Sequence, residues 1–483
     1  MPPLNRQDTR PSIHSYWSDS NPGLQGPTIN LHAAAKPLLR FLYNRQALGI
    51  IEKNRGNPLS SEDMDIYLSY FPWNYVSWST KAEILWHLTY RAGSSEEDAR
   101  TMIVSGVFHF IEQMLRSPDS HLRSCSWRLL ARLASYEYAA LAILDLKPCA
   151  QLVSLSLNED YEVMGVAMHA LAQIARRLEG AQAIIDSEIL GRVLRLLELP
   201  FVGIGACELV GRLAGHNSTS SAILKLKPCA RLLYIVGDED YQVVKTAMHA
   251  LAQIAQWSDG AEAIVDTRPL GHALELLKSP RPEIRQWTCT LVARLASHES
   301  TAPAILELKL CERLVSLMRD KNSGVIFTAV YALSQIARWL EGAQDIVVAR
   351  ALDNLSTLLN SPCKDVWAVT CSLVGWLASH ESTAQAILAL HLSARLVFLI
   401  VHEPDVRICA SAIFAVCEIC GWPDGVAALV STDGLPELEE ELNHDESLDV
   451  HTRSRAHIIL DSLARYKAGK TPLVHEATEA TGA

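Results

Sequence analysis

The sequence predicts an all-α fold, a right-handed α-solenoid in which about nine to ten similar helical units stack in one direction. The octapeptide MHALAQIA occurs at 168–175 and returns unchanged at 248–255. A short apolar anchor recurs about every 41 residues over eight units. No alternating run of apolar and polar residues is long enough to predict a sheet. An array of this kind grows without enlarging a single core, which suits a chain of 483 residues.

Two motifs alternate along the chain, so the repeat has a doubled period of 80 to 83 residues. The first motif returns as VYALSQIA at 330–337 and, in degraded form, as IFAVCEIC at 413–420. The second motif reads LLARLAS at 129–135, LVGRLAG at 209–215, LVARLAS at 291–297 and LVGWLAS at 373–379. A regular spacing over this many copies indicates a repeat architecture, and each half of the doubled period is one unit.

Each unit is predicted to contain three helices. In the unit that starts at Ser300, the apolar-rich segments 302–308 and 310–318 predict two short helices, and 325–339 predicts a longer third one after a polar turn. Serine is a favoured helix-capping residue, so Ser218, Ser300 and Ser382 are predicted to cap the first helices. The central anchor residues are Ile143, Ile184, Ile223, Ile264, Ile305, Ile346, Ile387 and Leu429.

The ends of the array need caps, because a terminal unit cannot bury its outer face against a neighbour. We expect an N-terminal helical cap at 31–80, the repeat solenoid at 81–467 with a closing helix at 449–466, and mobile tails at 1–30 and 468–483. Ser60–Asp63 and Thr80–Glu83 have the spacing of capping boxes at helix starts.

The third-helix core Ala332-Leu333-Ser334-Gln335-Ile336-Ala337 resembles the armadillo-repeat superfamily, in which an asparagine usually occupies the glutamine position. The resemblance covers about 81–466, and the HESTA turns at 298–302 and 380–384 look like those of a large, poorly characterised fungal group of armadillo-type proteins. The glycine that the family usually has between the first and second helices is mostly absent, so the conformation of that turn is left undetermined. The HEAT class has an overlapping period and is the alternative; three helices per unit favour armadillo.

The third helices of a solenoid lie side by side, so their polar positions four residues apart form a ladder. The resemblance implies that this ladder lines a concave groove, in which the glutamines hold a bound peptide's backbone and His169, His249 and Tyr331 replace tryptophans. The candidate partner-binding residues are Arg128, Arg132, His169, Gln173, Arg212, His249, Gln253, Arg294, Tyr331, Gln335, Trp376 and Glu418. The alternative is a solvated polar stripe, in which Arg212 pairs with Glu208 of its own helix.

Composition narrows the classes of partner. The net charge is −11, from 43 basic and 54 acidic residues, which disfavours broad nucleic-acid binding. No apolar run approaches the ~18 residues of a membrane span. We therefore expect a cytoplasmic protein with access to the nucleus, whose eleven cysteines are free thiols. His216, His298 and His380 recur after alternate third helices, where a histidine interacts favourably with the helix dipole.

No sequence signature of catalysis, of a metal site or of a cofactor site is present; the CxxC at 417–420 lies within a predicted third helix without a second pair. The sequence thus predicts a non-enzymatic scaffold that holds an extended peptide or disordered segment of a protein partner. Arginine rungs on the ladder would suit an acidic or phosphorylated partner. A passive or self-associating array and an enzyme with an unrecognised site are the alternatives. The acidic segment 437–449 is a second candidate surface, for a basic partner, and the oligomeric state is left open.

Overall fold

The computed structural model describes residues 31–54, 57–70, 76–149, 161–187, 189–197, 199, 202–267, 271, 274–444 and 449–469. Over these residues the regular secondary structure is helical, without a strand, which confirms the predicted all-α class. The chain divides into two compact units, Met1–Ile84 and Leu85–Ala483. The tail expected at 1–30, and residues 470–483 of the tail expected at 468–483, lie outside the described residues.

The first unit contains α1 (Leu31–Lys53), α2 (Ser61–Tyr70) and the start of α3 (Trp78–Ser94). The capping box before α2 is confirmed: the Asp63 amide donates to the Ser60 hydroxyl at 3.1 Å, and the Ser60 amide donates to the Asp63 carboxylate at 3.2 Å. The capping box expected at Thr80 is wrong. Ser77 caps α3 instead, because its hydroxyl accepts the Thr80 amide at 3.1 Å, so Thr80 already lies inside the helix.

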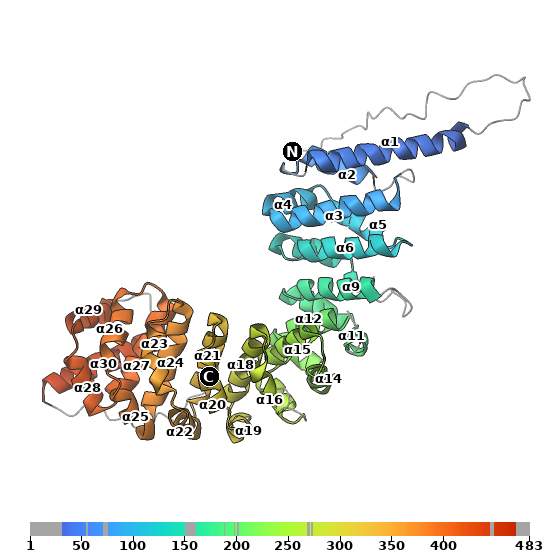
Figure 1. The fold of residues 1–483 in the computed structure, drawn as a ribbon. Helices are drawn as coiled ribbons and strands as arrows, with labels where there is room; N and C mark the ends of the chain where they lie inside the picture. The colour runs from blue at the N-terminus through green and yellow to red at the C-terminus, as the bar shows by residue number, and fades with distance from the viewer. Residues whose placement is uncertain are drawn as a thin grey trace, which may run out of the picture. The chain divides into compact units, whose positions relative to one another are not determined.

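The long third helices of the repeats form the centre of the second unit. They are α6 (Ser120–Leu133), α9 (Tyr161–Ile174), α12 (Val202–Ala214), α15 (Tyr241–Ile254), α18 (Pro282–Ser297), α21 (Ser323–Ile336), α24 (Lys364–Ser379), α27 (Val406–Cys420) and the closing helix α30 (Val450–Lys467). Consecutive members pack directly on one another, and Figure 1 shows α18, α21, α24 and α27 side by side. Their apolar residues, such as Leu209 and Leu213, are buried.

Shorter helices accompany each third helix and cover the core. They are α4 (Glu96–Val104), α5 (Val107–Leu115), η2 (Glu137–Ala139), α7 (Ala140–Asp145), α10 (Leu178–Asp186), α11 (Leu190–Leu196), α13 (Asn217–Leu224), α14 (Cys229–Ile235), α16 (Ser258–Val265), η3 (Glu275–Lys278), α19 (Ala302–Glu307), α20 (Cys311–Leu317), α22 (Leu340–Val348), α23 (Leu352–Leu359), α25 (Glu381–Leu388), α26 (Ser393–His402), α28 (Pro423–Val430) and α29 (Leu435–His444). Fully described units such as α19–α20–α21 therefore hold three helices, as predicted.

The turn between first and second helices keeps a left-handed residue although glycine is missing. Lys147, Lys227, Lys309, Arg350 and His391 have φ between 47° and 62°, and each lies four residues after its anchor isoleucine. A left-handed residue lets the chain reverse sharply after a short helix. The turn thus has the conformation that favours glycine, at a steric cost of roughly 1–2 kcal/mol per residue.

This conformation makes position 227 unfavourable for a β-branched side chain. We expect Lys227→Val to lower the free energy of unfolding by about 1–2 kcal/mol, because a branched Cβ is disfavoured at positive φ. Lys225→Val is the matched control, since Lys225 is also exposed and has a right-handed φ of −56°. Urea unfolding of the two variants measures the difference; equal stabilities would contradict the strain.

A hydrogen bond between neighbouring units closes the ends of six consecutive third helices, α9 to α24, and its donor alternates with the doubled period. A histidine Nε2–H or a tryptophan indole N–H donates to an alanine carbonyl of the preceding third helix, at 2.7 to 3.0 Å. The pairs are His216–Ala175, Trp257–Ala214, His298–Ala255, Trp339–Ala296, His380–Ala337 and Trp422–Ala378. These histidines therefore bond to the helix end of the neighbouring unit. His298 and His380 also stand at the C-cap of their own third helices, and the expected interaction with the dipole of that helix stays a prediction.

The residue three positions after each of these donors also alternates, between threonine and glycine. After each histidine a threonine hydroxyl donates to the carbonyl of the last leucine of the same third helix, as Thr301 does to Leu295 at 2.5 Å. After each tryptophan the equivalent residue is a glycine, such as Gly342, where a Cβ would overlap the Ile336 carbonyl oxygen. The predicted serine caps are wrong here: His216, Thr301 and His380 stand at the N-cap position, without a capping bond from their side chains.

All eleven cysteines are free, and all but Cys363 are buried. Burial raises the pKa of Cys207, Cys289 and Cys371 to about 12, so these thiols stay neutral. Among the described helices none alone is long and apolar enough to cross a bilayer; the pair α25 and α26, bent by 84°, meets the length and composition together. The apolar residues of α26, such as Leu396 and Ile400, are buried.

Candidate functional site

A hollow of about 580 Å³ lies on the polar face of the third helices, which we call the third-helix face. Five consecutive third helices, α9 to α21, contribute to its wall. The lining residues are His169, Ile204, Glu208, Arg212, Gln242, Lys245, Thr246, His249, Glu283, Gln286, Trp287, Thr290 and Thr328. Three of the twelve predicted binding residues, His169, Arg212 and His249, thus share one hollow.

Glu208 on α12 connects two third helices at one end of the hollow. It accepts hydrogen bonds from His169 Nδ1 at 2.8 Å and Gln173 Nε2 at 3.0 Å, both on α9, and Arg212 of its own helix lies 3.9 Å away. Burial alone raises the pKa of Glu208, but the hydrogen bond and charge of His169 and the charge of Arg212 outweigh it and lower the pKa below its usual value. The pairing of Arg212 with Glu208, considered as the alternative from the sequence, is confirmed.

His249 on α15 lines the hollow and makes a T-shaped contact with Trp287, with ring centroids 4.5 Å apart. Gln253 Nε2 lies 3.2 Å from its Nε2, a contact in which a neutral imidazole accepts. Burial, followed by the positive charge of Arg212, lowers the pKa of His249 to about 4. The ring is therefore neutral at pH 7 and presents an apolar and hydrogen-bonding surface, not a charge.

The depressed pKa makes stability depend on pH. Unfolded, His249 takes up a proton near pH 6.5, whereas in the folded protein it does so near pH 4. The unfolded state thus binds more protons between these values, and stability falls as pH falls from about 6.5 to 4, by at most about 3 kcal/mol. Urea unfolding of the wild type and of His249→Gln at pH 7 and pH 4.5 measures this. We expect a smaller pH effect in the variant; the same slope in both proteins would show that His249 does not contribute.

Polar groups around Trp287 remain unengaged. The side chains of Lys245, Glu283 and Gln286 have no hydrogen bond or ion pair within the part of the chain that the structure describes. Sequence reasoning did not select them, although Lys245 and Gln286 lie one helical turn before the ladder positions His249 and Thr290. Extending the four-residue spacing by one turn would have found both.

Other predicted residues bond to neighbouring units and not to the hollow. Arg294 donates to the Ala252 carbonyl and to Gln253 Oε1, and burial lowers its pKa. It is therefore half-buried and not the exposed rung that we expected. Arg128 pairs with Glu162 of α9 at 2.9 Å, at the surface.

The remaining predicted residues lie elsewhere on the same face. Arg132 is exposed, and its guanidinium group lies against Gly93. Tyr331 stacks on Phe327, with ring centroids 6.5 Å apart, and Gln335 Oε1 accepts from Arg338 at 3.4 Å. Trp376 lines a separate hollow on α24 and α27, and Glu418 is half-buried near the end of α27.

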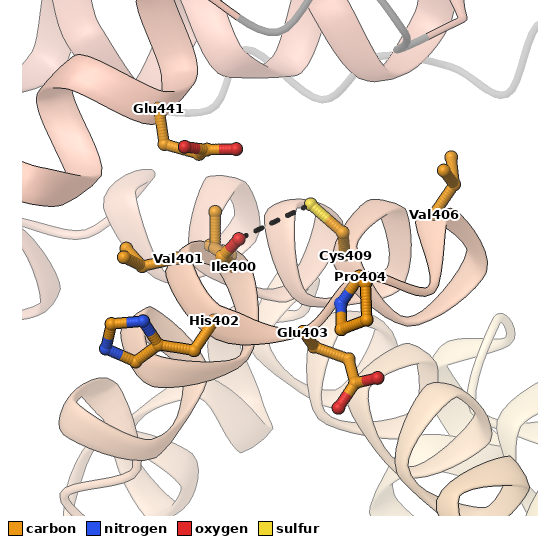
Figure 2. A pocket seen from close by; sticks show the side chains of 8 residues that line it. All are labelled: Ile400, Val401, His402, Glu403, Pro404, Val406, Cys409 and Glu441. Atoms are coloured by element: carbon orange, nitrogen blue, oxygen red, sulfur yellow. Dashed lines mark hydrogen bonds between the residues drawn. The ribbon is translucent and has the colours of Figure 1, made fainter.

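A different hollow, of about 320 Å³, lies where α26 ends (Figure 2). The Ile400 carbonyl accepts a weak hydrogen bond from the Cys409 thiol at 3.8 Å, and Glu441 reaches over this contact from α29. Glu403 is paired with Lys364 at 2.9 Å. The lining comes mainly from the second helix α26 and the turn after it, with residues from the start of α27 and from α29, so this hollow lies off the third-helix face.

The acidic segment 437–449 was the second candidate surface. Glu439 pairs with Lys467 at 2.5 Å, and Asp449 caps α30 by accepting the amides of His451 and Thr452 at 2.9 and 3.1 Å. Glu439 and Asp449 thus have partners within the chain. Asp445 and Glu446 lie outside the described residues.

The chain matches no protein-family model, and no curated protein matches it significantly. An engineered protein solved by the Northeast Structural Genomics Consortium is 25% identical, and the match covers 84% of this chain and 99% of that one with a TM-score of 0.68. Two designed armadillo repeat proteins, one in complex with the peptide (KR)4, are 23% identical over 48% of this chain and 98% of theirs, with TM-scores of 0.44.

The three-helix unit separates armadillo from HEAT repeats. The fold is an armadillo-type solenoid. A fold of this type suggests a protein-interaction scaffold.

Proposed function

We propose that the protein is a non-enzymatic scaffold that binds an extended segment of another protein along the third-helix face. The observation that carries the proposal is the hollow of about 580 Å³ around Trp287, with Lys245, Glu283 and Gln286 left unengaged at its wall. Unengaged polar groups around an aromatic surface are typical of recognition sites, since they fix the orientation of what is bound.

The chemistry of the wall suits a peptide in an extended conformation. The carboxamide of Gln286 can donate to and accept from one backbone amide, and the Trp287 ring can pack against an apolar side chain. Packed helices lie ~8–10 Å apart, so the path from α12 to α18 is ~16–20 Å. An extended chain rises ~3.3 Å per residue and would cross this path in about five or six residues.

The hollow by itself does not favour one sign of charge in the partner. Lys245 and Glu283 supply one charge of each sign, and Arg212 lies beside Glu208. Arg294 is engaged by α15. A preference for acidic partners, expected from three exposed arginine rungs, would therefore have to come from another part of the face.

Peptide selection tests the proposal without requiring the identity of the partner. Sixteen-residue peptides are selected from a random display library on the immobilised full-length protein, and their affinities are measured by fluorescence anisotropy. We expect Trp287→Ala and Gln286→Ala to weaken the selected peptides, the tryptophan change by about tenfold or more, because buried aromatic contacts carry much of the affinity at such sites. Tyr234→Ala is the matched control, since Tyr234 is 79% exposed on the second helix α14.

The outcomes separate the alternatives. Peptides that bind both third-helix variants as tightly as the wild type would place recognition elsewhere on the protein. If no peptide is selected and the mass in light scattering rises with concentration, the self-associating array is favoured instead. Circular dichroism melts of each variant exclude loss of fold as the cause of weak binding.

A further inference from the structure

Two aromatic rings and two guanidinium groups form a continuous row on the C-terminal part of the third-helix face. Trp376 of α24 packs edge to face with Phe414 of α27, with centroids 5.0 Å apart. The Arg338 guanidinium, just after α21, lies 5.5 Å from the Trp376 ring. Arg455 of α30 lies 4.6 Å from the Phe414 ring. Residues of four consecutive units thus meet in this row.

Beside the rings lies a hollow of about 260 Å³, lined by Ser372, Trp376, Ala410, Ser411, Phe414 and Arg455. Gly375 helps to shape it, because a Cβ at this position would lie 2.5 Å from the Phe414 ring. The ring therefore packs closely against α24 at Gly375, and Phe414 is only 7% exposed. The floor of the hollow is held in place by packing and does not depend on a ligand.

Arg455 is the charged residue among those that line this hollow, so the lining carries a positive charge. Within the described residues no carboxylate lies within ion-pair distance of Arg455 or Arg338; Arg338 donates instead to the Ser297 carbonyl at 3.2 Å and to the Gln335 amide oxygen. Nearby arginines do have acidic partners, for example Arg407 with Asp405 at 2.8 Å. Two arginines without counter-ions on one face of a chain with a net charge of −11 indicate a place for an anion.

The same contacts disfavour a cationic ligand. Lysine, arginine or a quaternary ammonium group would bind such rings through a cation–π interaction. The guanidinium groups of this chain already make cation–π contacts with both rings. A second cation would therefore meet like charge in the hollow, whereas a carboxylate or phosphoryl group would meet the guanidinium of Arg455 and its planar donors.

We propose that the hollow between α24, α27 and α30 binds an anionic side chain, carboxylate or phosphoryl, of the segment held on the third-helix face. The proposal rests on the proposed function and assigns one position of the bound segment. From α18 to α27 are three helix-packing steps, ~24–30 Å, or about seven to nine residues of an extended chain. The anionic side chain is thus expected about seven to nine residues from the one that contacts Trp287.

Four labelled peptides that differ in side-chain charge serve as probes: (Glu-Ser)6, (phosphoserine-Ala)6, (Gln-Ser)6 and (Lys-Ser)6. Binding to the full-length protein is measured by fluorescence anisotropy at low and high salt. We expect one or both anionic peptides to bind and the neutral and cationic ones to bind at least about tenfold more weakly. The two anionic arms distinguish carboxylate from phosphoryl recognition. Equal binding of (Glu-Ser)6, (phosphoserine-Ala)6 and (Gln-Ser)6 overturns the proposal.

Two variants locate the effect. Arg455→Gln should weaken the anionic peptides about five- to tenfold, and Ser411→Asp should do so without removing the arginine, since it adds a negative charge to the hollow. Arg465→Gln is the matched control, on the same helix but outside the hollow. Anionic binding that survives both changes in folded protein overturns the proposal. If library-selected peptides still depend on Trp287 in that case, the proposed function stands and only the anionic position fails.

Discussion

Deleting His216–Ser297 should leave a folded, shorter solenoid. The deletion joins Gly215 to His298, which stands at the position of His216 in the doubled repeat. His298 would then donate to Ala175 as His216 does now, and α21 would stack on α12 in place of α15. Each unit contacts mainly its neighbours, so removal of one whole doubled repeat costs only its own interfaces. Circular dichroism should show the same helical signal per residue and a single melting transition.

Deleting only His216–Glu239 should abolish the fold of this region. That change removes α13 and α14 but keeps α15, on which α14 packs, so part of the buried apolar surface of α15 would meet water. Light scattering should show aggregation, and the melt should lose its cooperativity. If the two deletions behave alike, the helices are not grouped in the units described above.

Gly342→Val should destabilise the protein strongly. A Cβ at this residue would overlap the backbone carbonyl oxygen of Ile336 and crowd its side chain, and a backbone atom cannot move aside as a flexible side chain can. We expect the free energy of unfolding to fall by about 3 kcal/mol or more. Replacing a glycine inside a helix ordinarily has the opposite effect and raises stability by up to ~1 kcal/mol. Gly260, at the equivalent position of another unit, should respond as Gly342 does.

Gly191→Val is the control for this effect. Gly191 lies in the first turn of α11 with no atom within 4 Å of an added Cβ. Its substitution should change stability by less than about 1 kcal/mol. Urea unfolding of the three variants measures the difference, and similar losses at Gly342 and Gly191 would refute the close approach. Thr301 occupies the corresponding place after a histidine, so a side chain fits there only where its hydroxyl can donate to the carbonyl beneath it.

The sequence by itself determined the helices, the three-helix unit and the doubled period. These follow from short-range patterns: apolar residues three and four apart, polar turns between them, and identical octapeptides 80 residues apart. The polar stripe of the third helices was also predictable, because residues four apart share one face of a helix. His169, Arg212 and His249 were found in this way, and all three line the same hollow.

Only the tertiary structure decided which polar residues bond between units, because these contacts join residues some 35 to 44 positions apart. Arg294 bonds to α15, so an expected rung became part of the stacking between units. Trp287, Lys245 and Gln286 came to surround a hollow that no single helix defines. A histidine followed by a threonine in one unit alternates with a tryptophan followed by a glycine in the next. This alternation was visible in the sequence, but its reason was not. Both pairs close the same junction, one with a hydroxyl over a helix-end carbonyl and the other with no side chain there at all.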